Sequence, residues 1–168
     1  MSRTTQKALL QLHEEVDRTT REVRGRLPPL TCKLGCSECC MDGITVFEVE
    51  AERIRQQFPA VLNQAAHAEG ACAFLDEKGA CRVYEARPYV CRTQGLPLAW
   101  FEEDEEAVDK PIVEHRDVCH LNAGLIHLPL LKGDSTWILG PFEERLCDVE
   151  AADSDIPRPR VALRSLFR

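Results

Sequence analysis

The sequence lacks both a long apolar run and an excess of positive charge. No stretch approaches the roughly 18 consecutive apolar residues that a membrane-spanning helix needs, and the opening MSRTTQKALLQLHEE lacks the apolar core of a signal peptide. We therefore expect a cytoplasmic protein with no membrane partner. The 28 acidic and 21 basic residues give a formal net charge of −7. This charge opposes attraction to phosphate backbones, so nucleic acid is not expected as a partner.

Common catalytic motifs are also missing. No phosphate-cradling glycine loop, HExxH helix or Ser-His-Asp arrangement stands out. The acidic segment FEEDEEAVDK (101–110) is interpreted as a solvated loop or helix face. His115, His120 and His127 could add a ligand to a site, especially His120 beside Cys119, but we interpret them as surface or hydrogen-bonded core residues.

Length and hydrophobic spacing predict one α+β domain over residues 1–168. With 168 residues and 44% apolar content, the chain can bury a modest core. An amphipathic N-terminal helix is predicted over 3–25, because apolar residues recur there at helical spacing. Residues 28–150 form the expected cysteine-cluster core, and residues 151–168 form a basic tail.

Short elements are expected within the core and the tail. Beyond the first helix they are a strand at 44–47, helices over 48–58 and 61–69, a short helix within 84–90, and a last helix over 142–150. The segments LPLL (128–131) and TWIL (136–139), joined by KGDS, predict a C-terminal β-hairpin. We therefore expect a small, loop-rich, cysteine-rich domain that a metal organises.

Cysteine is the abundant feature of this chain. There are nine, and TCKLGCSECC (31–40) places four of them within nine residues. In a reducing compartment, clustered thiols are more plausibly ligands than disulfides, and an odd count leaves one thiol unpaired. Thiolate sulfur is soft and binds zinc and iron strongly. Disulfides, or a redox pair in CSEC (36–39), remain alternatives.

The adjacent pair Cys39 and Cys40 is the most informative part of this cluster. Consecutive side chains of an extended segment point to opposite sides, so the two thiols are expected to face different surroundings. Without Cys147, eight cysteines would suffice for two four-thiolate sites. Two centres, or one polynuclear centre, are therefore favoured over a single mononuclear site. Cys147, on a predicted helix, is interpreted as a buried thiol.

Arginines flank the later cysteines in CRVYEARPYVCR (81–92). Eight thiolates around two divalent cations would leave roughly four uncompensated negative charges. Arg87 and Arg92 are therefore interpreted as cofactor-binding residues that donate hydrogen bonds to sulfur. The alternative for them, and for Arg82, is ion pairing with nearby acidic residues, namely Asp76, Glu77 and Glu85.

TCKLGCSECC, ITVFEVEAERI and CAFLDEKGACRVYEARPYVCR together resemble the CxxCxxCC cysteine-cluster family, the YkgJ-type zinc- or iron-chelating domain. The cysteine-rich part of flagellin lysine-N-methylase is related to this family. The chain departs from the family pattern with three residues rather than two after its first clustered cysteine. The resemblance implies eight metal-ligand cysteines, which are Cys32, Cys36, Cys39, Cys40, Cys72, Cys81, Cys91 and Cys119.

The predicted function is metal binding, with zinc or iron held through these eight thiolates as mononuclear ions or as an iron–sulfur cluster. Thiolate suits both metals, so spacing does not separate them. The alternative is a methyl-transfer enzyme dependent on S-adenosylmethionine and an iron–sulfur cluster, or its accessory subunit. The CxxxCxxC spacing at 32–39 favours it. Against it, Glu38 replaces the usual aromatic residue and no strand–helix repeat for a partial barrel is present.

Overall fold

The computed structural model describes residues 1–32, 35–107, 109–154 and 156–167. The elements in chain order are α1 (Arg3–Gly25), β1 (Thr45–Val46), α2 (Glu48–Gln57), α3 (Pro59–Leu62), η1 (Tyr84–Ala86), α4 (Tyr89–Thr93), β2 (Leu98–Glu103), β3 (Ile112–Asp117), α5 (His120–Ala123), η2 (Leu128–Leu130), η3 (Gly133–Ser135), β4 (Trp137–Ile138), α6 (Pro141–Ala151), β5 (Val161–Ala162) and η4 (Leu163–Leu166). Helices and small sheets together confirm the α+β class. None of the helices in these ranges is long and apolar enough to cross a membrane.

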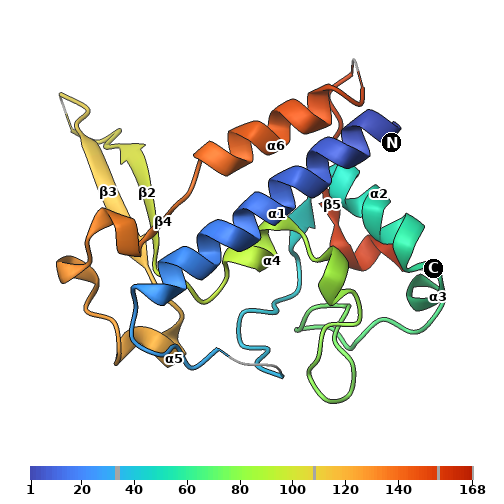
Figure 1. Ribbon diagram of the computed structural model, residues 1–168, viewed down its shortest axis with the longest axis horizontal. Coiled ribbons are helices and arrows are strands. Elements are labelled where there is room, and N and C mark those ends of the chain that lie inside the picture. The colour runs from blue at the N-terminus through green and yellow to red at the C-terminus, as the bar shows by residue number, and fades with distance from the viewer. Residues whose placement is uncertain (33–34, 108, 155, 168) are drawn as a thin grey trace.

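Helix α1 is the centre of the arrangement. It runs through the middle of the molecule with α6 alongside, and it also contacts α2 and α4 (Figure 1). Its N-terminus is capped by the Ser2 hydroxyl, which accepts a hydrogen bond from the Thr5 N–H at 3.0 Å. The apolar stripe predicted from the sequence is buried, at Leu9, Leu12, Val16 and Val23. The predicted bounds of this helix are confirmed.

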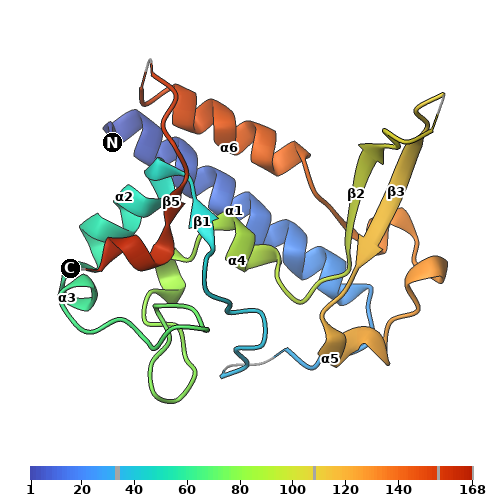
Figure 2. The same cartoon turned by 180° about the vertical axis from the view of Figure 1, so that it is seen from behind.

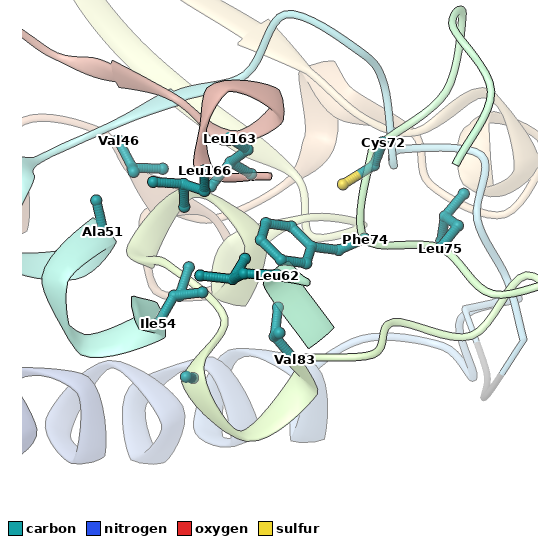
Figure 3. Packing of buried hydrophobic residues seen from close by; sticks show 11 residues of the cluster. Val46, Ala51, Ile54, Leu62, Cys72, Phe74, Leu75, Val83, Leu163 and Leu166 are labelled. Atoms are coloured by element: carbon teal, nitrogen blue, oxygen red, sulfur yellow. The ribbon is translucent and has the colours of Figure 1, made fainter. Parts of the chain in front are cut away.

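Two clusters of buried side chains form the core. The first joins α2 to the C-terminal residues and the central loops, through Val46, Ile54, Phe74, Val83, Leu163 and Leu166 among others (Figure 3). The second surrounds α1 and includes Val49, Tyr89, Leu96, Trp137 and Leu146. Cys72 lies at the margin of the first cluster (Figure 3), and Cys40 and Cys81 pack against it. The apolar core thus reaches up to the cysteine loops.

The β-hairpin lies in a different place from the predicted one. Strands β2 and β3 form it, pairing antiparallel with Trp100 opposite His115, and the acidic segment provides the end of β2 and the turn. Residues 128–130 are instead a 3₁₀ turn, and β4 pairs parallel with β2. The apolar pattern predicted that residues 128–131 pair with residues 136–139. That pairing is wrong, because the Leu128–Leu130 segment contains a proline and bends.

One further expectation needs adjustment. The weaker helix predicted over 61–69 is limited to α3, which ends at Leu62. The tail forms ordered contacts with the body: Arg158 pairs with Glu150 at 2.5 Å, and Arg164 Nε donates to Asp42 at 2.8 Å. Leu163 and Leu166 are buried in the first core cluster, so residues after α6 belong to the folded domain. Arg168 lies outside the described residues.

A buried polar network connects α1, α2 and α4. Arg53 Nη1 lies 2.7 Å from His13 Nδ1, and His13 Nε2 lies 3.1 Å from Glu50 Oε1. A guanidinium can only donate, so Nδ1 accepts and Nε2 carries the proton that binds Glu50. The same Glu50 oxygen accepts the Tyr89 N–H at 2.7 Å. His13 is therefore held as a neutral imidazole by partners on both nitrogens.

This network predicts a loss of stability in mild acid. Burial lowers the pKa of His13 from its ordinary value of 6.5, and nearby Arg92 and Arg53 lower it further, although Glu50 opposes them. The unfolded chain then binds this proton more readily than the folded one. The stabilisation is therefore complete above pH 6.5 and decreases as the pH falls towards the folded-state pKa, by up to about 1.4 kcal/mol per pH unit.

Urea unfolding at pH 7.5 and 5.5 would measure this change. We expect His13→Gln to reduce the pH dependence in this interval and the exposed-site control His127→Gln to retain it. An unchanged pH dependence in His13→Gln would contradict the assignment.

Candidate metal centre

Seven of the eight predicted ligand cysteines line one cavity of about 650 Å³. They come from three separated parts of the chain and are Cys32, Cys36, Cys39, Cys40, Cys72, Cys81 and Cys91. All nine cysteines lie within the described ranges, and each is a free thiol. The expectation that thiols from distant positions gather in space is therefore met for these seven, and the disulfide alternative is not realised in this structure.

Turns in the loops bring the sulfurs to the cavity. In the first loop, Cys40 N–H donates to the Ser37 carbonyl at 2.8 Å, and the Cys40 carbonyl accepts from Cys72 N–H at 2.8 Å. The second loop folds back at Asp76, whose Oδ1 accepts from Lys78 N–H and Ala80 N–H, both at 2.8 Å. Leu75 and Cys81 consequently form an antiparallel bridge. These local hydrogen bonds bring the 72–81 loop against the 36–40 turn.

The wall that faces these loops is cationic. Arg21 and Arg24 reach the cavity from α1, and Arg87 and Arg92 reach it from the segment that includes α4. Asp17, also on α1, bridges the second pair: Arg87 Nη2 lies 3.1 Å from its Oδ1, and Arg92 Nη1 lies 2.5 Å from its Oδ2. Four arginines and one carboxylate therefore line the same cavity as the sulfurs.

Arg87 and Arg92 were predicted to donate hydrogen bonds to sulfur. Both line the cavity, but in the described residues they donate to Asp17, and Arg87 also donates to the Tyr84 carbonyl. Their ion-pair partner is Asp17 rather than the acidic residues near them in the sequence. Arg87 also stacks on the Tyr84 ring at 4.1 Å. Arg82 does not line the cavity. It donates to the Ala73 carbonyl at 2.8 Å and lies over the Phe167 ring.

Sequence reasoning missed the contribution of α1. Asp17, Thr20, Arg21 and Arg24 all line the cavity and recur at spacings of three and four. Residues at this spacing share one face of a helix. The signal was therefore present as a polar stripe, but only the tertiary structure shows that this stripe faces sulfur rather than solvent.

Cys119 and the three histidines do not line the cavity. Cys119 precedes α5, which lies next to the first cysteine loop: His120 Nε2 is 3.5 Å from Glu38 Oε2, and both side chains are exposed. His115 stacks on Trp100, with ring centroids 5.4 Å apart, and His127 is exposed. Cys147 is exposed on α6, so its interpretation as a buried thiol was wrong.

The sulfurs share a cavity without yet forming a coordination sphere. Within the described ranges, no three His, Cys, Asp or Glu side chains are placed where one metal ion could contact them all. Ligation would therefore require the cysteine loops to close inward. The donor set itself fits zinc or iron, because it consists of soft sulfur atoms and contains almost no competing carboxylate.

Burial makes most of these thiols resist ionisation in the absence of a cation. It raises the pKa of Cys72 and of Cys81, and it raises the pKa of Cys91 to about 12. The adjacent pair behaves differently: a hydrogen bond from Cys40 lowers the pKa of Cys39 to about 6, and the pKa of Cys40 rises correspondingly. A bound metal would have to displace protons from the buried thiols.

The comparison with known families matches the part of the chain that contains the predicted ligand cysteines. Residues 31–120, more than half of the chain, match the model of the CxxCxxCC family, which is described as a "Putative zinc- or iron-chelating domain". No curated protein and no solved structure matched the chain. The predicted resemblance to the cysteine-cluster family is confirmed, whereas no match connects the chain with flagellin lysine-N-methylase.

The unlike environments of the thiols predict unequal reactivity in the metal-free protein. At pH 7, iodoacetamide should alkylate Cys39 at least about tenfold faster than Cys91, because the thiolate is the reactive form. Cys40→Ala removes the hydrogen bond and should slow the reaction at Cys39. Peptide mapping by mass spectrometry gives both rates, with exposed Cys147 as an internal reference. Equal rates at Cys39 and Cys91 would contradict this ordering.

Proposed function

The chain belongs to the CxxCxxCC family, and we propose that it binds zinc or iron through the thiolates of the cavity. The observation that carries this proposal is the convergence of seven free cysteines from three chain segments on one cavity. Thiols are easily oxidised, so a cluster of this many at the margin of the core is expected where they bind a metal. The bound metal would supply the cross-link between loops that contain few regular elements.

The charge of the cavity wall supports a centre with more than one metal ion. Seven thiolates exceed the four that a single tetrahedral zinc accepts. Two divalent cations with the eight proposed thiolates would carry a net charge of −4, and the four arginines with Asp17 carry +3. The charge of the wall therefore offsets most of the charge of such a centre. We therefore propose two ions or one polynuclear centre, including an iron–sulfur cluster, in this cavity.

Cys119 remains the eighth ligand of the proposal. Its helix, α5, contacts the first cysteine loop through His120 and Glu38, and Thr31 N–H donates to Asn122 Oδ1 at 2.8 Å. Cys119 would join the centre when the loops close around metal. In the metal-bound state the arginines would stabilise the thiolates as they lose their protons.

A second candidate is chemistry on S-adenosylmethionine at an iron–sulfur centre. The observation that favours it is the volume of the cavity, about 650 Å³, which lies in the range of small-molecule sites and exceeds the space that metal ions need. Brown charge-transfer absorption with inorganic sulfide, followed by binding and cleavage of S-adenosylmethionine, would support this candidate. A colourless protein that contains zinc would exclude it.

Substitution of the cysteines tests the metal proposal directly. Cys36→Ser or Cys91→Ser should lower both the metal content after anaerobic purification and the melting temperature, because ligand binding is coupled to folding. The matched control is Cys147→Ser, which lies outside the cavity and should leave the metal content unchanged. Elemental analysis measures the outcome. Equal metal loss in all three variants, or no metal in the wild type, would overturn the proposal.

The cationic wall gives a second test. Arg87→Gln should weaken Zn²⁺ binding about tenfold, because an arginine beside the thiolates is removed while Arg92 keeps its pair with Asp17. Arg18→Gln changes the same charge at an exposed position of α1 and should have little effect. Competition with a chromophoric chelator measures both affinities. Equal affinities in the two variants would show that Arg87 does not stabilise the thiolates.

A further inference from the structure

Asn122 is a fully buried amide whose side chain is directed at one cysteine sulfur. Its relative exposure is 0%, and it belongs to α5, just beyond the residues that match the family model. Its Nδ2 lies 3.4 Å from Cys32 Sγ. The two residues are 90 positions apart in the sequence, and α5 lies beside the segment that leaves α1 (Figures 1 and 2). Neither spacing nor periodicity predicts this contact.

The same amide connects three parts of the chain. Nδ2 also donates to the Gly95 carbonyl at 3.1 Å, and Oδ1 accepts from Thr31 N–H at 2.8 Å. Thr31 Oγ1 adds a bond to the Leu121 carbonyl at 3.1 Å. The side chain therefore uses both of its N–H groups and its oxygen. This fixes the position of the backbone that carries Cys32 relative to α5 and to the segment after α4.

Gly95 lies against the other side of Cys32 Sγ. Its φ is +82°, a left-handed conformation that glycine adopts readily, and a Cβ at this position would overlap Cys32 Sγ. Arg24 is also next to Gly95, because its Nη2 donates to the Gln94 carbonyl at 3.3 Å. The Cys32 sulfur is thus held between an amide donor and a bare backbone at one end of the cavity.

We propose that Asn122 is a positioning residue that, together with Gly95, holds Cys32 in the metal-ligand set. This inference rests on the proposed function. An N–H group aimed at a ligand sulfur carries part of its negative charge once metal replaces the thiol proton, and it fixes the direction of the sulfur. Cys32 lies at the start of the first cysteine loop, and its neighbour Thr31 is bonded to Asn122 and to the Leu121 carbonyl. The Asn122 side chain therefore fixes the position of Cys32, which the cysteine spacing in the sequence does not determine.

The test is residue-specific protection in the chain loaded with Zn²⁺. Iodoacetamide labelling and peptide mapping report each cysteine separately. In the wild type, Zn²⁺ should protect Cys32 together with the other lining cysteines. In Asn122→Asp, Cys32 should become alkylated about tenfold faster while Cys72 and Cys91 stay protected, because a carboxylate replaces the donor. Asn63→Asp makes the same chemical change at an exposed site and should leave the wild-type pattern.

Two further variants separate positioning from a general structural role. Asn122→Ala loses every bond of the side chain, whereas Asn122→Asp keeps the acceptor for Thr31 N–H. If donation to sulfur matters, the alkylation rate of Cys32 should be at least as high in Asn122→Asp as in Asn122→Ala. A smaller increase in Cys32 alkylation in Asn122→Asp than in Asn122→Ala would assign the role to the Thr31 contact and overturn the proposal. Gly95→Ala approaches the same sulfur from the other side and should also expose Cys32 selectively.

The remaining outcomes are equally decisive. Unchanged protection of Cys32 in Asn122→Asp would overturn the inference. So would simultaneous exposure of all lining cysteines in both Asn122→Asp and Gly95→Ala, because this would indicate only a loss of fold. If Zn²⁺ protects no cysteine in the wild type, the proposed function fails first, and the inference fails with it.

Discussion

Compensation of buried negative charge is the constraint on which this cavity depends. Soft metals require thiolates, and thiolates gathered at the edge of an apolar core require nearby positive charge. Helix α1 meets this requirement because one stripe of it is apolar and packs into the core while the adjacent stripe presents Arg21 and Arg24 to the cavity. Asp17 then fixes Arg87 and Arg92 in place. One helix thus serves both the core and the site.

Without metal, the buried thiols of the cavity avoid negative charge by keeping their protons. Burial keeps the pKa of Cys72, Cys81 and Cys91 high, so these thiols retain their protons until a cation arrives. A metal ion bound by these sulfurs would have to displace their protons, so its binding would be coupled to proton release. The adjacent pair differs because Cys40 donates a hydrogen bond to Cys39. The expectation that these two thiols face different surroundings is not met, because the segment is a turn, closed by the bond from Cys40 N–H to the Ser37 carbonyl, and both thiols line the same cavity.

Most of the buried contacts of the scaffold are made by residues other than the cysteines. The two core clusters join α1, α2, α6 and the C-terminal residues, and the network of His13, Glu50 and Arg53 connects α1 and α2 to the start of α4. The cysteine loops extend from this frame and are held by turns. The sulfurs of these loops share one cavity, but within the described residues no three His, Cys, Asp or Glu side chains are placed to contact one ion.

The sequence by itself determined the α+β class, the bounds of α1 and the family, because these follow from residue type and from contacts between near neighbours. The resemblance to the cysteine-cluster family implied the ligand set, and seven of those eight residues line one cavity. Only the tertiary structure decided which distant groups meet the sulfurs. The α1 stripe, the Asn122 amide and the true hairpin partner of β2 depend on packing between segments far apart in the chain. No local spacing encodes such contacts, because they are set by how the core brings the elements together.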